Sequence, residues 1–330
     1  VMAWSVTQGI LDLGATTQTA TGFTLTGGEL RNGTLSTAGS FALSNGTVSA
    51  LLGGTGSLVK SGTGTVVLTG TNTYSGGTFV NGGTLRIGGD WALGDVSGAL
   101  TLNGGALQVT GNPVSFTLER QIILGANGGT FDVGAGKNLI LDGVVSGDGQ
   151  LAKTSSGTLT LTGANSYSGG TAVRGGSLVA AATGALGDGP VTINSNGSGG
   201  WARLYFSGND AAYPVSAQDL SITVGRGDLN FQGNATAGAA TIVLAQDGYG
   251  GLHFGTGTDA GTASITNQGG GFVAFTGASA ANATIVNDGL GVPYYFSRTT
   301  FDDDYSSNEF SSAGDATITN RNGGSTTFYG

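Results

Sequence analysis

Short alternating runs of hydrophobic and polar residues occur along the whole chain. Examples are the runs at 65–69, 84–87, 100–102 and 158–161, where Val, Leu or Ile alternates with Thr or Arg. Each run is followed by Gly, Asn or Asp, residues that accept the backbone of tight turns. No hydrophobic run at helical spacing persists for three turns. The pattern therefore predicts an all-β protein built from many short strands.

Two long segments of the chain repeat one another. The first, residues 58–95, reads LVKSGTGTVVLTGTNTYSGGTFVNGGTLRIGGDWALGD, and the second, residues 151–188, reads LAKTSSGTLTLTGANSYSGGTAVRGGSLVAAATGALGD. The copies align without a gap. Recurrence of one unit indicates a repeat architecture, in which each unit buries its hydrophobic residues against its neighbours.

A shorter repeat follows in residues 240–330. The tetrapeptides Ala-Thr-Ile-Val, Ala-Ser-Ile-Thr, Ala-Thr-Ile-Val and Ala-Thr-Ile-Thr begin at 240, 263, 283 and 316, and aromatic residues follow at Phe254, Phe275 and Phe328. A period of 20–23 residues with two or three short strands suits one coil of a parallel β-helix. The longer last spacing predicts an inserted loop within 290–312. We expect a single β-solenoid over 1–330, with about 15 coils stacked at the spacing of neighbouring strands.

The residues of the long repeat resemble the passenger-associated strand repeat of bacterial autotransporters. The first copy supplies Gly62, Gly64, Leu68, Thr69, Gly70, Asn72, Tyr74, Ser75, Gly76, Gly77, Thr78, Val80, Gly82, Gly83 and Leu85. The second supplies Gly157, Leu161, Thr162, Gly163, Asn165, Tyr167, Ser168, Gly169, Gly170, Thr171, Val173, Gly175, Gly176 and Leu178, with Ser155 in place of one glycine. The resemblance implies a right-handed parallel β-helix (β-solenoid) that is displayed on, or shed from, the outer surface of a Gram-negative bacterium, with an adhesive or structural role.

Composition narrows the function further. Lys and Arg number only 11 against 20 acidic residues, giving a net charge of −9, and the basic residues are scattered. No basic stripe can neutralise phosphates, so we expect no nucleic-acid partner. Cysteine is absent, which excludes disulfides and thiolate chemistry. We expect neither a membrane-spanning segment nor a signal peptide or translocator barrel in this chain.

The tripeptide Arg226-Gly227-Asp228 has the form of an integrin-type cell-attachment signal. An exposed charged loop of this kind would suit an adhesin. Chance occurrence in a glycine-rich chain is the alternative, and then the three residues only form a turn.

Aromatic and acidic residues gather in the predicted insertion. The aromatic residues, proposed as a partner-binding surface, are Tyr294, Tyr295, Phe296, Phe301, Tyr305 and Phe310. Loops carry function and aromatic anchors dominate interface energies, although a small core packed on the solenoid flank is the alternative. Asp302, Asp304, Ser306 and Asn308 alternate like the first half of a calcium loop, but Ser307 and Ala313 replace the required Gly and Glu. We therefore expect no metal site and no cofactor.

Catalytic groups are sparse in the sequence. His253 is the only histidine, in Leu252-His253-Phe254, where alternation points it to solvent if its neighbours face inward. Acidic residues occur mostly in Gly-Asp turns such as those at Asp95 and Asp188. We expect a non-enzymatic extracellular protein that contacts a glycan or protein on a host or bacterial surface. The alternatives are a fibre subunit that self-associates through its terminal coils and, as a minor one, a polysaccharide-acting enzyme.

Overall fold

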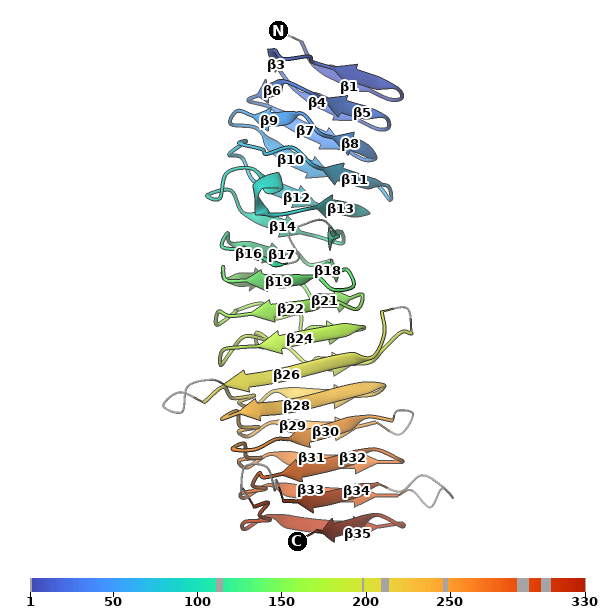
Figure 1. Ribbon diagram of the computed structural model, residues 1–330, viewed down its shortest axis with the longest axis vertical. Coiled ribbons are helices and arrows are strands. Elements are labelled where there is room, and N and C mark those ends of the chain that lie inside the picture. Colours follow the sequence, from blue (N-terminus) through green and yellow to red (C-terminus); the bar gives the residue numbers. More distant parts are fainter. Residues whose placement is uncertain are drawn as a thin grey trace. The chain divides into compact units, whose positions relative to one another are not determined.

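The protein is a parallel β-solenoid of about 13 turns, with coils about 21 residues apart. The computed structural model describes residues 2–110, 115–197, 199–208, 214–245, 249–289, 297–303 and 310–329. The chain forms two compact units, one of residues 1–152 and 166–169 and the other of residues 153–165 and 170–330. Figure 1 shows short strands stacked coil upon coil within each unit.

The first unit contains three rows of parallel strands. One row consists of β1 (Trp4–Val6), β4 (Phe23–Leu25), β7 (Ser40–Leu43), β10 (Ser57–Lys60), β12 (Thr78–Val80), β14 (Leu100–Leu102), β17 (Ile122–Leu124) and β20 (Val145–Gly147). The second consists of β2 (Ile10–Asp12), β5 (Glu29–Arg31), β8 (Gly46–Val48), β11 (Thr65–Leu68), β13 (Thr84–Ile87), β15 (Ala106–Val109) and β18 (Gly129–Val133). The third consists of β3 (Thr17–Ala20), β6 (Thr34–Thr37) and β9 (Leu51–Gly53), and the pair β16 (Ser115–Leu118) and β19 (Asn138–Leu141) lies further along the chain.

The second unit contains two longer rows. One consists of β23 (Thr171–Val173), β25 (Val191–Ile193), β27 (Ser221–Val224), β29 (Thr241–Leu244), β31 (Ser264–Gln268), β33 (Thr284–Asp288) and β35 (Thr317–Arg321). The other consists of β22 (Thr158–Leu161), β24 (Gly176–Ala180), β26 (Ala202–Gly208), β28 (Gly227–Gly233), β30 (Gly251–Phe254), β32 (Phe272–Thr276), β34 (Arg298–Asp302) and β36 (Ser325–Phe328). The boundary between the units falls within β21 (Leu151–Thr154).

Side chains alternate between a buried column and the outer face along each strand. In β11, for example, Val66 and Leu68 are buried while their neighbours are partly exposed. The predicted Ala-Thr-Ile segments align in register, so that Ile242, Ile265 and Ile285 stack on consecutive coils. Such stacking removes apolar surface from water once per coil, which is how a solenoid forms a continuous core.

A stack of phenylalanine rings runs along the second unit and is buried except at its end, where Phe328 is 62% exposed. The rings are those of Phe206, Phe231, Phe254, Phe275, Phe301 and Phe328, with neighbouring centroids 4.7 to 5.0 Å apart and planes within 9° of parallel. The spacing equals that of neighbouring strands, because each ring comes from the same register position of successive strands.

A turn that the sequence analysis missed precedes five successive strands of the same unit, β27, β29, β31, β33 and β35. A hydroxyl or carboxylate accepts a hydrogen bond of 2.7 to 3.1 Å from the backbone N–H two residues later, at Ser216, Thr236, Asp259, Ser279 and Ser312. The residue that donates this bond is left-handed in every case, at Gln218, Gly238, Gly261, Ala281 and Gly314. These are turns in which the side chain replaces a backbone acceptor, and they fix where each following strand begins.

The predicted insertion is divided in two by a strand. Residues 289–297 separate β33 from β34, where only residues 269–271 separate β31 from β32. A second extension, residues 303–311, lies between β34 and the turn at Ser312. The 33-residue spacing thus comes from the longer chain separations before and after β34. The longest helix of the described residues is the single 3-10 turn η1 (Asp90–Leu93), and none of them forms a helix able to cross a membrane.

Candidate functional site: the outer face at Arg226

The characteristic side chains of the long repeat lie inside the solenoid. Asn72 is buried, and its Oδ1 accepts a hydrogen bond from the Leu52 N–H at 2.9 Å while its Nδ2 donates to the Ala92 carbonyl at 2.6 Å. Tyr74 is fully buried, with its hydroxyl 2.7 Å from Thr78 Oγ1. Burial raises the pKa of Tyr74. The Asn72 side chain thereby satisfies backbone groups that have no partner in a strand ladder.

The second copy uses the same positions in the same way. Asn165 Nδ2 donates to the Ala185 carbonyl at 2.6 Å, Tyr167 is fully buried, and Thr171 Oγ1 donates to the Leu186 carbonyl at 3.3 Å. The repeat motif therefore builds coils, and a ligand at the surface cannot reach it.

Two buried lysines belong to the same architecture and were missed by the sequence analysis. Lys60 Nζ donates to the carbonyls of Ser61, Gly62 and Gly82 at 2.8 to 3.1 Å. Lys153 donates to Thr154, Ser155 and Gly175 in the corresponding way. Burial lowers the pKa of Lys60. The signal was present in the sequence, since alternation from Leu58 puts Lys60 on the inward side.

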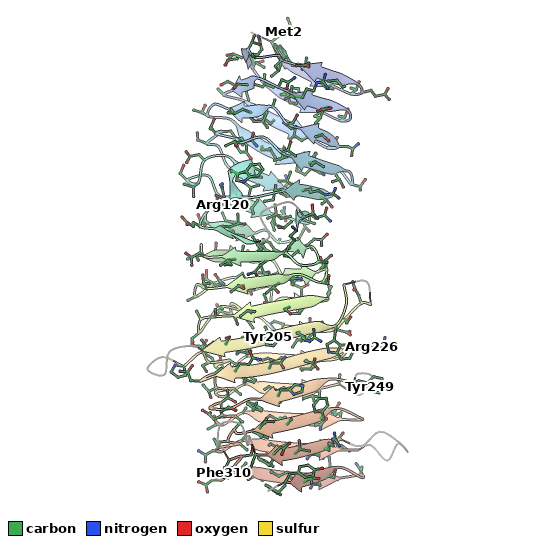
Figure 2. All side chains as sticks on the ribbon, viewed as in Figure 1. Met2, Arg120, Tyr205, Arg226, Tyr249 and Phe310 are labelled. Carbon is green, nitrogen blue, oxygen red and sulfur yellow. The ribbon has the colours of Figure 1, made fainter. Side chains whose placement is uncertain are left out.

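Arg120 holds a loop of the first unit in place (Figure 2). Its guanidinium is fully buried and donates to Asp90 Oδ1 at 2.7 Å and to the carbonyls of Leu93, Gly94, Asp95 and Gly98 at 2.8 to 3.1 Å. All of these acceptors lie in η1 or directly after it. Arg120 therefore has a structural role.

The outer face of the second unit carries a different set of side chains. Trp201, Arg226 and Tyr249 occupy corresponding outward positions on three consecutive coils, because β26 pairs with β28 at Ala202 and Gly227, and β28 pairs with β30 at Asp228 and Gly251. We call these three residues the Trp–Arg–Tyr row. Trp201 is 38% exposed, Tyr249 is 58% exposed, and Arg226 is exposed. Arg226 and Tyr249 project at the same edge in Figure 2.

Asp228 orders the side chains next to the row. Its carboxylate accepts a hydrogen bond from Trp201 Nε1 at 2.7 Å and lies 3.6 Å from Arg203 Nε and 3.9 Å from His253 Nε2. The rings of His253 and Phe272 pack nearly perpendicular to each other, with their centroids 4.8 Å apart. The tripeptide 226–228 therefore lies at the beginning of β28, with the Arg226 side chain open to solvent and the Asp228 side chain surrounded by partners.

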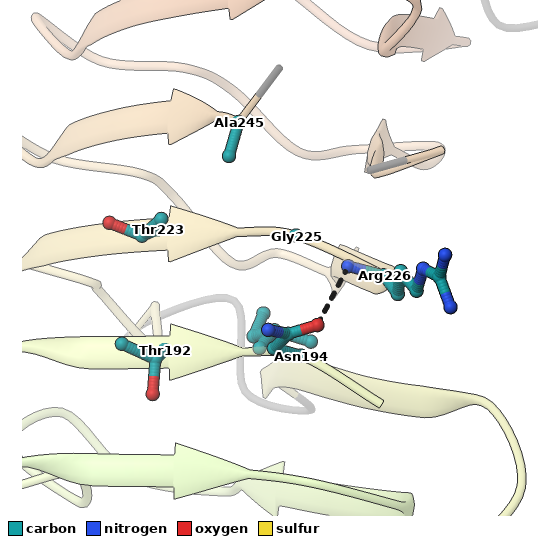
Figure 3. A pocket seen from close by; sticks show the side chains of 7 residues that line it. Thr192, Asn194, Thr223, Gly225, Arg226 and Ala245 are labelled. Atoms are coloured by element: carbon teal, nitrogen blue, oxygen red, sulfur yellow. Dashed lines mark hydrogen bonds between the residues drawn. The ribbon is translucent and has the colours of Figure 1, made fainter. Parts of the chain in front are cut away.

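A hollow of about 290 Å³ adjoins the row (Figure 3). Its lining residues are Thr192, Ile193, Asn194, Thr223, Gly225, Arg226 and Ala245. The Arg226 backbone N–H donates to Asn194 Oδ1 at 3.4 Å, and the Arg226 side chain extends away from Asn194. Arg226 thus lines the hollow and lies between the two aromatic residues of the row.

Among the described residues, four arginines pair with carboxylates and Arg226 does not. Arg31, Arg120, Arg203 and Arg321 each have a carboxylate oxygen within 3.6 Å. No ion pair of Arg226 occurs among the described residues. Because the chain carries a net charge of −9, an exposed arginine without a carboxylate is a feature that a ligand would use.

The structure places the predicted aromatic cluster in several environments. Phe301 lies in β34 and is 1% exposed, because its ring completes the interior stack, so it is not part of an outer surface. Phe310 is 74% exposed. Tyr294, Tyr295, Phe296 and Tyr305 lie outside the described residues, as do Asp304, Ser306 and Asn308 of the calcium pattern.

Two further titratable residues from the sequence analysis, His253 and Asp95, take part in a strand and a turn. His253 points outward between buried Leu252 and Phe254, as alternation predicts. Asp95 Oδ1 accepts hydrogen bonds from the Ser97 N–H at 2.9 Å and hydroxyl at 2.6 Å, and these bonds lower the pKa of Asp95. Within the described part of the chain, no three His, Cys, Asp or Glu side chains are grouped so that they could hold a metal ion.

Comparison with known proteins places these features in context. The chain is 42% identical over 117 residues to a protein named adhesin BmaC autotransporter of Brucella suis biovar 1 (strain 1330). The match covers 35% of this chain and 3% of that adhesin. A solved structure of a TibC-catalyzed hyper-glycosylated TibA fragment covers 100% of this chain and 98% of its own length, with 16% identity. At a TM-score of 0.35 this likeness is too weak to bear on fold or function.

A family model described as the passenger-associated-transport-repeat matches the core of both long repeats. Each match covers the buried lysine, asparagine and tyrosine described above, which gives the motif its physical basis. The chain therefore contains two passenger-associated-transport repeats, at residues 58–87 and 151–180.

Proposed function

We propose that this chain is part of a non-enzymatic adhesive β-solenoid, displayed on or shed from the outer surface of a bacterium, which contacts its partner through the face around Arg226. The two transport repeats and the similarity to an autotransporter adhesin support the general function. The observation that carries the proposal is the Trp–Arg–Tyr row, in which two partly exposed aromatic side chains flank an arginine that has no ion pair among the described residues.

Inward and outward side chains of the solenoid have different roles, and this difference supports the assignment. The buried polar side chains of the repeats, such as Asn72, Lys60 and Lys153, form hydrogen bonds inside the coils. The outer face can therefore carry recognition without disturbing the fold. Tyr, Trp and Arg are the residues most enriched among the energetic anchors of interfaces, and the row combines all three within two coil spacings.

Cell attachment tests the proposal directly. The purified chain would be coated on a surface, and attachment of epithelial cells and of bacterial cells would be counted against an uncoated surface. We expect attachment above background, and a loss to near background in the double variant Trp201→Ala, Tyr249→Ala. Trp91→Ala is the matched control, because Trp91 is 40% exposed and lies outside the face.

The outcomes separate the hypotheses. Attachment that survives the double variant would place the contact elsewhere and reject this face. A chain that attaches no cell but forms filaments in electron micrographs would instead favour the end-to-end fibre.

A further inference from the structure

We propose that Arg226, together with the aromatic side chains and the hollow beside it, binds a carboxylated saccharide, such as a uronic or sialic acid unit of a surface glycan. This inference rests on the proposed adhesive function and names the ligand class of its contact face. The argument uses the charge of Arg226, the geometry of the row, and the lining of the hollow.

The charge of Arg226 selects for an acidic group. The side chain is exposed and has no ion pair among the described residues, in a protein whose net charge is −9. A guanidinium presents its donors in a planar fork that matches a carboxylate with two parallel hydrogen bonds. Since the rest of the protein repels anions on average, a local cation of this kind confers selectivity for a ligand with a single well-placed carboxylate.

The aromatic neighbours suit a ring-shaped ligand. Trp201 and Tyr249 lie one coil before and one coil after Arg226, so the row spans two coil spacings, or about 10 Å. A chain of two linked sugar rings has this length. Aromatic side chains provide a large, rigid contact area with an apolar face, against which the C–H face of a sugar ring packs while its hydroxyls stay in water.

The position of Trp201 is fixed before any ligand arrives. Its indole N–H donates to Asp228 at 2.7 Å, and Asp228 also lies near Arg203 and His253. A side chain that is already ordered loses little conformational entropy on binding, which raises affinity for a given contact area.

The hollow beside Arg226 favours a sugar over an acidic peptide. Its volume of about 290 Å³ is at the small end of the range for ligand sites. The outward Thr192, Asn194 and Thr223 side chains in its lining offer hydroxyl and amide groups, which pair with sugar hydroxyls. An acidic peptide would share the contact with Arg226 but has no comparable set of hydroxyls for this lining.

Saturation-transfer NMR and titration with defined probes test the inference. The probes are trigalacturonate and 3′-sialyllactose as acidic saccharides, maltotriose and lactose as neutral ones, and hexaglutamate as an acidic peptide. We expect at least one acidic saccharide to bind at least tenfold more tightly than its neutral counterpart and than hexaglutamate. Its affinity should fall at higher salt, because the pairing with Arg226 is exposed to solvent.

Variants of the row assign the binding to named residues. Arg226→Gln should weaken binding at least tenfold, and Arg226→Lys several-fold, because lysine keeps the charge but loses the planar fork. Arg86→Gln is the matched control, since it also removes one exposed arginine but lies in the first unit. Tyr249→Ala should reduce the saturation transfer to sugar ring protons, and the double variant Trp201→Ala, Tyr249→Ala should remove it. A circular dichroism spectrum unchanged from the original chain would show that each variant is folded.

Three results would overturn the inference. These are binding of neither acidic saccharide below 10 mM, equal or tighter binding of hexaglutamate, and an equal effect of the Arg226→Gln and Arg86→Gln changes. The attachment assay separates this failure from that of the proposed function. A chain that attaches cells through the row without binding acidic sugars would remain an adhesive segment with another ligand.

Discussion

Replacement of Asn72 by alanine should open the solenoid locally around β9 and η1. The side chain bonds two backbone groups of neighbouring coils, the Leu52 N–H at 2.9 Å and the Ala92 carbonyl at 2.6 Å. Both residues are fully buried, so water cannot replace the lost partner without distortion. An unsatisfied buried backbone group costs about 1 to 3 kcal/mol. We therefore expect a local loss of roughly 3 kcal/mol, since two groups are affected.

Amide hydrogen exchange is the appropriate assay for this change. A long array of repeats need not unfold in one step, so a single melting temperature can conceal a local effect. A loss of about 3 kcal/mol corresponds to about a hundredfold faster exchange, and we expect it for the Leu52 amide and its neighbours in β9. Strands several coils away should keep their protection, because coils interact mainly with their nearest neighbours.

Two further variants complete this test. Asn81→Ala removes an exposed asparagine from the same repeat and should leave exchange unchanged. Asn165→Ala removes the corresponding side chain of the second copy and should produce a similar loss near Ala185, to whose carbonyl Asn165 donates. Unchanged protection of Leu52 in Asn72→Ala would refute the view that the asparagine of the repeat supports the coil.

Three more predictions concern other parts of the fold. Ala281→Gly should stabilise the second unit by about 0.5 to 1 kcal/mol in denaturant unfolding, because Ala281 has a φ of 49° where the aligned turn uses Gly261; destabilisation would contradict the left-handed geometry. Arg120→Met should make the loop after η1 at least tenfold more sensitive to protease, since five carbonyl and carboxylate acceptors lose their donor; an equal rate would show that the loop holds without it. Hydrogen bonds from Asn32, Gly14 and Arg31 lower the pKa of Asp12 from 3.8. Its contribution to stability is therefore present above that value and lost as the pH falls below it. The stability difference between the original chain and Asp12→Asn should accordingly shrink between pH 5 and pH 2 in acid titrations followed by circular dichroism, and a constant difference would contradict the lowered pKa.

The strands and their register were largely predictable from the sequence. The alternating runs at 65–69 and 84–87 became β11 and β13, and the Ala-Thr-Ile segments became successive strands of one row. This follows because a parallel coil places the same residue type at the same position in each turn, so that periodicity in sequence and position in space coincide.

Prediction failed where loop lengths vary. Phe301 was assigned to a binding loop because it lies among other aromatic and acidic residues within the predicted insertion. In the structure β34 lies within the predicted insertion, and Phe301 in β34 keeps its place in the phenylalanine stack. From the sequence, only Phe254, Phe275 and Phe328 were identified as repeating aromatic positions. Phe301, whose ring lies between those of Phe275 and Phe328, was not identified because it falls within the predicted insertion.

The Trp–Arg–Tyr row could not be found from the sequence for a related reason. Trp201, Arg226 and Tyr249 are separated by 25 and 23 residues, and only the pairing of β26, β28 and β30 brings them to one outward position. Inward positions are constrained by stacking from coil to coil, whereas outward positions are free to differ. Substitutions in the row should therefore change binding with little effect on stability, and substitutions at Asn72 or Lys60 should do the reverse. A solenoid in which inward residues stabilise the fold and outward residues bind can acquire a new ligand without changes to its core.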